Sequence, residues 1–459
     1  MRPTFAIRET AILIRQIDLS GVKFQDALGY PRIDWEKYQR QKPPVVARSH
    51  RAVILQNRYV RVTVLPEMGR VYSFVFRPTG HEQFWTNSIA KPIPGQQNDT
   101  GWWLILGGAE YTIPRGEHGT TWALPWKYRI SENSSRRKAV EMRVLEPQTK
   151  IEQTLEIALF QDRAYYEAEI TLKNTGDQEA RFSHWVNPMW APGGRGQLTP
   201  DTELIVPCTA MIVLDRDFNR WMLGSTVQEY ERNPLRFVKH WRSIGDLLAQ
   251  QLTAGFYAAF SHEANEGVVR IFDPKDTPGM DIWTWGFPPP PERQREYSEV
   301  PNLGYVEMWG GTSRNFSDEA RGALGAGMHR RWKEQMYAFH NTGGLTYANQ
   351  DIALNFKSDQ QKKLVDLGLF VTRARRGVLV ELRQGDGVLL RRRLNLSPDR
   401  PFRARISAAK SQGSAQAVPR LILTHNRQVL ANVEAKLSQP MRWDFPYLPA
   451  EATKQKETR

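Results

Sequence analysis

Hydrophobic and polar residues alternate along most of this chain, in short runs separated by turn-forming residues. Residues 59–65 and 164–172 are the clearest of these runs. A period of two is typical of β-strands that bury one face and expose the other. Many short strands separated by Gly, Pro and Asn turns indicate an antiparallel sandwich or barrel. The pattern therefore predicts an all-β protein.

Changes in the pattern divide the chain into four parts. Residues 1–45 are expected to form an N-terminal arm packed on the main body, and dense strand signals then fill residues 46–345. Residues 346–447 contain further strand-like runs and predict a small appended β-sandwich. Residues 448–459 are polar, so we expect a disordered tail. Helical signals are few, and residues 236–251 are the best candidate for a helix.

Composition adds a functional hint to this picture. Aromatic residues make up 11% of the 459 residues and include 15 Trp. Trp and Tyr combine a large hydrophobic area with one polar group, which suits carbohydrate or peptide clefts as well as β cores. The formal net charge is +14. The basic residues are spread out and no nucleic-acid motif is present, so we expect a generally basic surface and no specific nucleic-acid partner.

The number of cysteines and the hydropathy of the chain indicate where in the cell the protein is expected. Cys208 is the single cysteine, which excludes an intrachain disulfide framework. No hydrophobic run approaches the roughly 18 residues of a membrane span, and the N-terminus lacks a sustained hydrophobic segment. We therefore expect a cytoplasmic protein with no membrane partner.

The strongest candidate for chemistry is the run at residues 304–311. Tyr305, Glu307 and Trp309 alternate there with two hydrophobic residues, so one strand face carries a carboxylate between two aromatic rings. Aromatic rings stack on the C–H faces of sugars, while a carboxylate handles hydroxyl groups. The alternative is an edge strand with a solvated glutamate.

A second candidate is the aromatic run at residues 181–190. His184 and Asn187 lie three positions apart in it. Histidine is the usual general acid near neutral pH. The alternative interpretation is a core histidine with no role in chemistry.

These motifs resemble those of the aldose 1-epimerases (galactose mutarotases). The run Ser183-His184-Trp185-Val186-Asn187-Pro188 resembles their Asn-His-x-x-x-Asn segment, although the gap from His to Asn is one residue shorter. The strand around Glu307 resembles the one that holds their catalytic base. Residues 57–71 resemble the opening strand and turn of that superfamily.

A closer resemblance is to an aldose-epimerase-like family of bacterial domains with no assigned function. Residues 107–114 are similar to that family's Gly-Gly-Ile-Glu-Phe-Asn-Trp-Pro motif, and His118, residues 283–286 and the Glu307 strand also match. The resemblance covers roughly residues 50–345. It implies a supersandwich, in which two large antiparallel sheets lie face to face and the site occupies a concave cleft.

The resemblance also implies roles for individual residues. His184 would be the general acid and Glu307 the general base of a reaction at the anomeric carbon of a sugar or oligosaccharide. Opposite protonation states on the two sides of the sugar would come from environment-shifted pKa values. The residues expected to contact the sugar are Arg70, His118, Trp185, Asn187, Trp283, Trp285 and Trp309.

One departure from the mutarotase pattern leaves the chemistry open. Leu106 stands where a His-Gly-Gly segment would begin, and Glu110 supplies a second carboxylate. Glu110 and Glu307 would then form the acid/base pair of a glycoside hydrolase or lyase. Glu110 is alternatively a buried carboxylate bonded to Arg70 or Arg115, and a non-catalytic sugar-binding protein is the third possibility.

The chain offers little for a metal or a cofactor. His118, Glu117 and Glu110 are the only grouping that suggests a cation site, but no HExxH or paired-cysteine motif accompanies them. No phosphate-binding loop is present. We therefore expect no metal and no cofactor, and the oligomeric state stays open.

Overall fold

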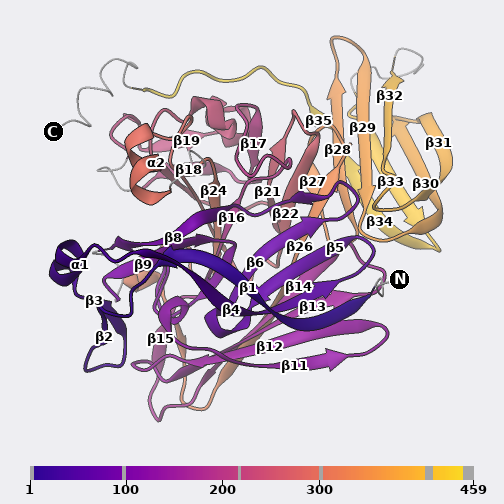
Figure 1. Ribbon diagram of the computed structural model, residues 1–459. Helices are drawn as coiled ribbons and strands as arrows, with labels where there is room; N and C mark the ends of the chain where they lie inside the picture. The colour runs from indigo at the N-terminus through magenta and orange to yellow at the C-terminus, as the bar shows by residue number, and fades with distance from the viewer. Residues whose placement is uncertain (1–4, 96–99, 215–218, 299–302, 409–416, 448–459) are drawn as a thin grey trace.

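The computed structural model describes residues 5–95, 100–214, 219–298, 303–408 and 417–447. These residues form mainly β-structure, in two large sheets and several small ones (Figure 1). Most strand pairings are antiparallel, as in the long ladder between β13 (Ile151–Phe160) and β14 (Tyr165–Asn174). The all-β fold predicted from the alternating pattern is confirmed.

The larger sheet carries the candidate site and has 14 strands. Its order along the sheet is β19 (Thr226–Gln228), β18 (Ala210–Val213), β20 (Gly245–Ala249), β23 (Gly279–Thr284), β24 (Val306–Gly311), β16 (Trp185–Trp190), β10 (Ala109–Thr112), β6 (Arg70–Phe76), β5 (Val60–Leu65), β4 (Val45–Gln56), β1 (Ala6–Ile17), β8 (Thr86–Pro94) and β9 (Trp102–Gly107), with β7 (His81–Glu82) beside β6.

The second sheet has eight strands and covers one face of the first. Its order is β11 (Lys127–Asn133), β12 (Arg137–Leu145), β13, β14, β26 (His329–His340), β22 (Glu266–Ile271), β21 (Phe256–Ser261) and β17 (Thr202–Ile205). One continuous hydrophobic core joins the sheets, with Val62 and Met308 from the larger sheet and Leu155 and Phe339 from the smaller one. This face-to-face packing is the sandwich that the sequence predicted.

Short elements connect and flank these sheets. The two-stranded pairs are β15 (Ala180–Phe182) with β25 (Gly322–Leu324), and β2 (Lys23–Gln25) with β3 (Pro31–Ile33). The α-helices are α1 (Trp35–Gln41) and α2 (Pro291–Tyr297). The 3-10 turns are η1 (Pro66–Met68), η2 (Thr121–Ala123), η3 (Tyr230–Arg232), η4 (Pro234–Arg236), η5 (Val238–His240) and η6 (Asp318–Ala320). None of the described helices is long and hydrophobic enough to cross a membrane.

The first residues contribute a full strand to the larger sheet. β1 pairs with β4 along the whole of its 12 residues. Ile14 and Ile17 at its end join a separate hydrophobic cluster with Trp102 and Trp122. The N-terminal part is therefore integrated into the main body rather than resting on its surface.

The helix expected at residues 236–251 does not form. The 3-10 turns η4 and η5 occupy its first part, and β20 occupies its last part. The run from Gly245 to Ala249 is buried on both sides within the larger sheet. A short, mainly hydrophobic run suits either a buried strand or a buried helix, and here the pairing with β18 and β23 makes it a strand. The helix prediction is therefore wrong.

A small sandwich follows the main body, as expected. One of its sheets contains β27 (Tyr347–Ala348), β28 (Ile352–Asp359), β29 (Leu364–Val371) and β32 (Phe402–Ser407), with β35 (Lys436–Leu437) beside β28. The other contains β31 (Gly387–Leu396), β30 (Arg375–Gln384), β33 (Arg420–His425) and β34 (Gln428–Glu434). The two sheets enclose their own hydrophobic core.

The C-terminal unit contacts the main body at two separate places. Phe370 stacks on Tyr337 of β26, with ring centroids 6.0 Å apart. Beyond β35 the chain returns across the main body, where Phe445 enters the large core and Tyr447 stacks on Trp221. The expected disordered tail at residues 448–459 lies outside the described residues.

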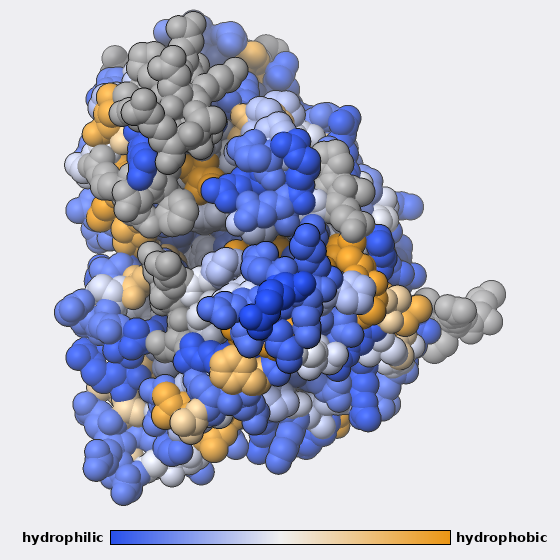
Figure 2. All heavy atoms as spheres, turned by 60° about the vertical axis from the view of Figure 1, so that its left-hand side comes forward, coloured by the Kyte–Doolittle hydropathy of each residue, from blue (hydrophilic) through white to orange (hydrophobic). Residues whose placement is uncertain are grey.

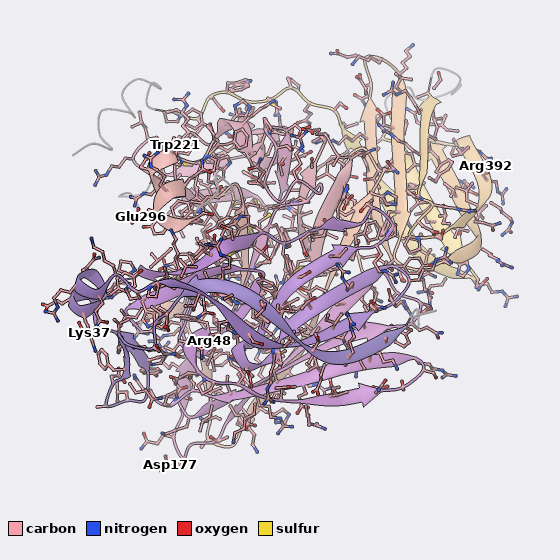
Figure 3. All side chains as sticks on the ribbon, viewed as in Figure 1. Lys37, Arg48, Asp177, Trp221, Glu296 and Arg392 are labelled. Carbon is pink, nitrogen blue, oxygen red and sulfur yellow. The ribbon has the colours of Figure 1, made fainter. Side chains whose placement is uncertain are left out.

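The surface is largely polar. The face in Figure 2 is mainly hydrophilic, with hydrophobic side chains in separate groups. Charged side chains such as Lys37 on α1 and Arg392 on β31 project outward (Figure 3).

A buried ion pair lies inside the core between the sheets. The Arg270 guanidinium is fully buried and its Nε donates to Glu334 Oε2 at 2.8 Å, while Nη1 donates to Tyr257 Oη at 3.0 Å. Trp332 Nε1 also donates to Glu334, at 3.1 Å. These donors hold the Glu334 carboxylate in a region that water does not reach.

Arg270→Met should destabilise the protein by about 3–5 kcal/mol, because it leaves Glu334 as an unpaired buried charge. Urea denaturation followed by tryptophan fluorescence measures this loss. The control is Arg129→Met, which breaks the exposed Arg129–Glu141 pair and should leave the midpoint almost unchanged. Similar midpoints for both variants would contradict the importance of the buried pair.

Candidate functional site

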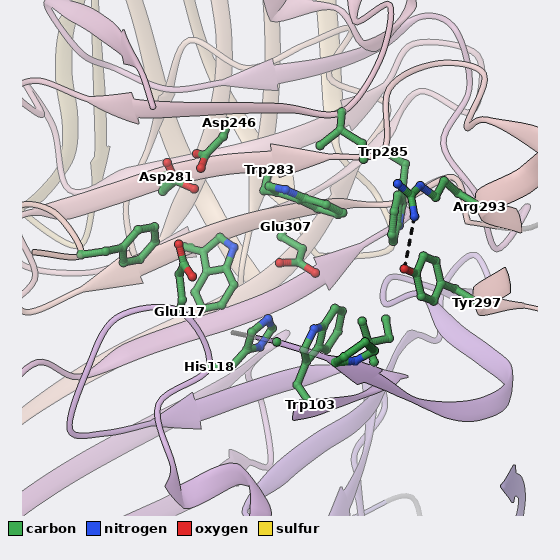
Figure 4. A pocket seen from close by; sticks show the side chains of 16 residues that line it. Trp103, Glu117, His118, Asp246, Asp281, Trp283, Trp285, Arg293, Tyr297 and Glu307 are labelled. Carbon is green, nitrogen blue, oxygen red and sulfur yellow. Dashed lines mark hydrogen bonds between the residues drawn. The ribbon is translucent and has the colours of Figure 1, made fainter. Parts of the chain in front are cut away.

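A cavity of about 400 Å³ opens on the face of the larger sheet that points away from the smaller one. Aromatic rings form much of its wall and carboxyl groups lie between them (Figure 4). The residues that line it are Ile93, Pro94, Gly95, Trp103, Glu117, His118, Ile244, Asp246, Asp281, Trp283, Trp285, Arg293, Tyr297, Glu307, Trp309 and Phe316. The combination of hydrophobic walls and a few convergent polar groups is typical of small-molecule sites.

Strand alternation places Glu307 in this cavity. On β24, Glu307 and Trp309 line the cavity, while Val306 and Met308 enter the core between the sheets. Trp283 lies directly opposite Glu307 on β23 and shares its face. The two-faced strand predicted from the sequence is therefore present, and the edge-strand alternative does not apply.

Glu307 is a buried carboxyl group, and only one of its two oxygens has a hydrogen-bond partner among the described residues. Its Oε2 accepts a hydrogen bond from Asn187 Nδ2 at 3.0 Å, whereas Oε1 has no partner among the described residues. Burial raises the pKa of Glu307 to about 7, against the opposing effect of His118 and with help from the Glu110 charge. A carboxyl group poised near neutrality can accept or donate a proton at working pH.

His118 faces Glu307 from a loop between β10 and η2. Its ring stacks on Trp103 with centroids 4.4 Å apart, and it meets Trp309 edge-on at 5.0 Å. His118 and its neighbour Glu117 both have positive φ, at 58° and 48°. Left-handed backbone is unfavourable for such side chains and is found at functional sites more often than elsewhere.

A carboxylate behind the ring orients His118. Glu110 Oε2 accepts from His118 Nδ1 at 3.0 Å, and Arg70 donates to the other oxygen. Burial lowers the pKa of His118, but the charge and hydrogen bond of Glu110, together with Glu307, raise it above the ordinary value. Because Nδ1 is bonded to Glu110, Nε2 is the nitrogen available to the cavity.

Arg70 holds Glu110 in its ionised form. The two residues are direct cross-strand partners on β6 and β10, and both are buried. Burial raises the pKa of Glu110, but Arg70 and His118 lower it below the ordinary value. The alternative that Glu110 is a buried partner of Arg70 is therefore what the structure contains, and Glu110 does not line the cavity.

Two further carboxyl groups line the cavity on the strands beyond Glu307. Asp281 on β23 and Asp246 on β20 are both buried. Burial, the neighbouring Asp246 charge and a shared hydrogen bond raise the pKa of Asp281 well above its usual range. The two carboxyl groups therefore titrate as a pair, and their proximity favours a shared proton. Neither residue could be identified from the sequence, because each lies in a mainly hydrophobic strand without a motif.

His184 does not reach the cavity. It is fully buried in the core between the sheets, where it meets Trp332 edge-on with centroids 5.0 Å apart. Burial and the charges of Arg270 and Arg330 lower its pKa to about 3, so the ring is neutral. Its ring nitrogens have no partner among the described residues. The structure contains the core histidine that was weighed as the alternative, and His184 is not brought together with Glu307.

The other predicted contact residues separate into two groups. Trp283, Trp285, Trp309 and His118 line the cavity. Trp185 lies beside it: its ring packs on Phe316, with centroids 4.4 Å apart, and Nε1 donates to Ser183 Oγ at 2.7 Å. Asn187 acts on the site through Glu307 and Arg70 through Glu110. The cavity residues that the sequence analysis missed also include Trp103, Arg293, Tyr297 and Phe316.

The described residues contain no group of three or more His, Cys, Asp or Glu side chains arranged to hold a metal ion. Glu117, Glu110 and His118, the grouping considered from the sequence, are separated by the direction of their side chains. Glu110 points to Arg70 behind the ring, whereas Glu117 lines the cavity.

Residues 25–330 match the family model described as a domain of unknown function, DUF5107. This match spans well over half of the chain. The chain belongs to the DUF5107 family. The resemblance to a family of unassigned function, inferred from the motifs, is thereby confirmed. Residues 347–432 match a second model, described as the second domain of YphG-like proteins.

Solved structures similar to this DUF5107 chain include a TPR-domain-containing protein from Parabacteroides distasonis, with a TM-score of 0.60 and 16% identity. That match covers 73% of this chain and 55% of the other, so the chain spans about half the length of that protein. At this identity the similarity concerns the fold alone.

Galactose mutarotase-like proteins from Clostridium acetobutylicum and Lactobacillus casei are also similar, with TM-scores of 0.46 and 0.41 and 10% identity in each case. These matches cover 63% and 62% of this chain and 96% and 99% of the other chains. Such remote similarity says nothing about function, which is inferred below from the residues of the cavity.

Glu307→Gln should change how stability depends on pH. The raised pKa means that the proton on Glu307 stabilises the folded state below pH 4.5, and that this contribution is lost as the pH rises through about 7. The variant carries no such proton and does not lose this contribution. The free energy of unfolding of the variant minus that of the wild type should therefore increase by about 3 kcal/mol from pH 4.5 to about pH 8.

Denaturant titrations at the two pH values measure this gain. Glu179→Gln, at an exposed position outside the cavity, is the control and should follow the wild type at both. A Glu307→Gln curve parallel to that of the wild type would show that the cavity does not perturb this carboxyl group.

Proposed function

We propose that this protein binds a sugar or oligosaccharide in the aromatic cavity and acts at the anomeric carbon by acid/base chemistry. Glu307 is the base and His118 is the acid. The observation that carries the proposal is the pairing of Glu307, whose Oε1 is buried and unpartnered, with a histidine ring that Glu110 orients on the other side of the same cavity. His118 takes the role that the sequence analysis gave to His184.

The reaction needs Glu307 as a carboxylate and His118 as an imidazolium. The Glu307 carboxylate accepts the proton of the anomeric hydroxyl as the C1–O1 bond gains double-bond character. The His118 imidazolium donates a proton to the ring oxygen as the bond from C1 to that oxygen breaks. Rotation of the open aldehyde and reversal of the proton transfers close the ring on the opposite face and invert the anomer. Each proton taken up in opening is returned in closure.

The aromatic walls suit the faces of a sugar ring. Trp283 and Trp285 pack edge-on at 4.8 Å, and Trp285 stacks on Tyr297 of α2 at 5.2 Å. These contacts fix the indole planes without filling the cavity. A rigid aromatic wall lowers the entropy cost of binding.

The Asp246–Asp281 pair favours a second candidate function, cleavage of a glycosidic bond. A protonated Asp281 would give its proton to the leaving oxygen while Glu307 activates a water or attacks the anomeric carbon. In this mechanism Asp281 replaces the Glu110 expected from the sequence, because both Glu110 oxygens are bonded to Arg70 and His118. A non-catalytic sugar-binding protein is the third outcome, and the cytoplasmic location stays a prediction.

Glu307→Gln should lower kcat/KM by about 10²–10⁴-fold while sugar binding persists, because the amide keeps the shape but cannot accept a proton. Polarimetry with α-glucose and α-galactose detects anomer inversion, and a reducing-end assay on oligosaccharides detects cleavage. Binding is measured by calorimetry. His184→Asn is the matched control for a histidine outside the cavity.

The outcomes separate the candidates. Faster mutarotation supports the proposed reaction, new reducing ends that disappear in Asp281→Asn support cleavage, and binding with neither supports a binding protein. Absence of binding across the panel would overturn the assignment of the cavity to sugars.

Glu110→Gln should shift the pH profile of kcat/KM to lower pH. Glu110 raises the pKa values of both His118 and Glu307, so its neutralisation lowers both. The profile is followed by polarimetry across pH 5–9. Glu167→Gln, another buried glutamate that lies far from the cavity on β14, is the control. A lower rate with an unmoved profile would mean that Glu110 has only a structural role.

A further inference from the structure

A second cavity lies where the C-terminal unit meets the main body. It has a volume of about 600 Å³ and is called the junction cavity here. The main body contributes Leu204, Arg232 and Arg236, and the C-terminal unit contributes Lys357, Lys436 and Leu437. Figure 1 shows β35 and β28 beside each other at this boundary. The sugar chemistry proposed above does not use this cavity.

Strand pairing puts two lysines side by side on the wall of the junction cavity. Lys357 on β28 is the direct partner of Lys436 on β35, and both line the cavity. Like charges directly opposite each other in a ladder are destabilising. On its other side Lys357 pairs with Asp366 of β29, but Arg405 Nε binds that carboxylate at 2.9 Å. The charge of Asp366 still favours the charged form of Lys357, but the two side chains form no ion pair.

The other cations of the junction cavity have partners. Lys436 Nζ lies 2.5 Å from Glu231 Oε1, and Arg232 Nη1 lies 2.7 Å from Glu229 Oε2. Arg236 forms an ion pair with Glu203. The Lys357 side chain, by contrast, has no hydrogen bond or ion pair to any residue in the described parts of the chain. Its ammonium group is the one positive charge of this set that has no fixed counter-ion.

The electrostatic field around the junction cavity is positive. Burial, Arg236 and Lys436 lower the pKa of Lys357 to about 8. His262, which bonds to Glu203 Oε2 at 2.6 Å, has a pKa lowered to about 4, first by burial and then by Lys357. His262 does not line the cavity, yet the same positive charges lower its pKa.

A partly buried cation with no partner is costly unless a mobile counter-ion supplies the missing charge. The junction cavity offers room for more than a single ion, since hydrophobic side chains such as Leu204, Val206 and Leu437 form part of its wall. A ligand that combines an anionic group with a hydrophobic part fits both features.

We propose that the junction cavity binds a small oxyanion, in which a phosphate or carboxylate group pairs with the Lys357 ammonium. The ligand contacts the main body and the C-terminal unit together, so its binding holds the two units against each other. Phosphate and carboxylate share the chemistry that Lys357 recognises, a compact negative oxygen group.

Inorganic phosphate and citrate are the probes, with sodium chloride at matched ionic strength as the blank. Each probe at millimolar concentration should raise the Tm of the full chain by scanning calorimetry, because it binds the folded state alone. Lys357→Gln removes the charge and should weaken binding at least tenfold by titration calorimetry. Lys173→Gln, at an exposed lysine on β14, should bind as the wild type does.

The Tm without any probe distinguishes a ligand site from a structural role. Lys357→Gln should be at least as stable as the wild type at low salt, because it removes an unpaired cation; a structural lysine would lose stability instead. A response to phosphate alone or to citrate alone identifies the source of the oxyanion. No response to either, or an equal response in Lys357→Gln, would overturn the proposal.

Discussion

The site depends on the two-residue alternation of the strands in the larger sheet. β23 and β24 each have one face in the core shared with the second sheet and one face toward the cavity. Glu307 and Trp309 reach the cavity because Val306 and Met308 fill the core, and a shift of one position would reverse both. The same register therefore fixes both the packing between the sheets and the residues that line the cavity.

Much of the fold and part of the site could be predicted from the sequence. Alternation along β24 correctly put Glu307 and Trp309 on one face. His184 immediately precedes β16 and Asn187 lies on it three positions later, and residues three apart on an extended chain point to opposite faces. The three-residue spacing therefore indicated that the two residues do not share a face, whereas the resemblance suggested that both contact the sugar.

His118 could not be placed from the pattern. It lies in a loop, where no periodicity assigns a direction, and its left-handed backbone depends on the tertiary structure around it. The Asp246–Asp281 pair could not be predicted for a similar reason. Each aspartate stands alone in a hydrophobic run, and only the pairing of β20 with β23 brings the two carboxyl groups together. Long-range strand pairing of this kind has no local signature.

The return of the chain from β35 to the main body constrains the C-terminal unit. Phe445 is inserted in the large core and Tyr447 lies on Trp221, while a separate part of the unit is attached through Phe370. An element fastened at two separate points cannot swing about a single hinge. The appended sandwich is therefore not an independent module. Its deletion or replacement would remove Phe445 from the large core and Tyr447 from its contact with Trp221.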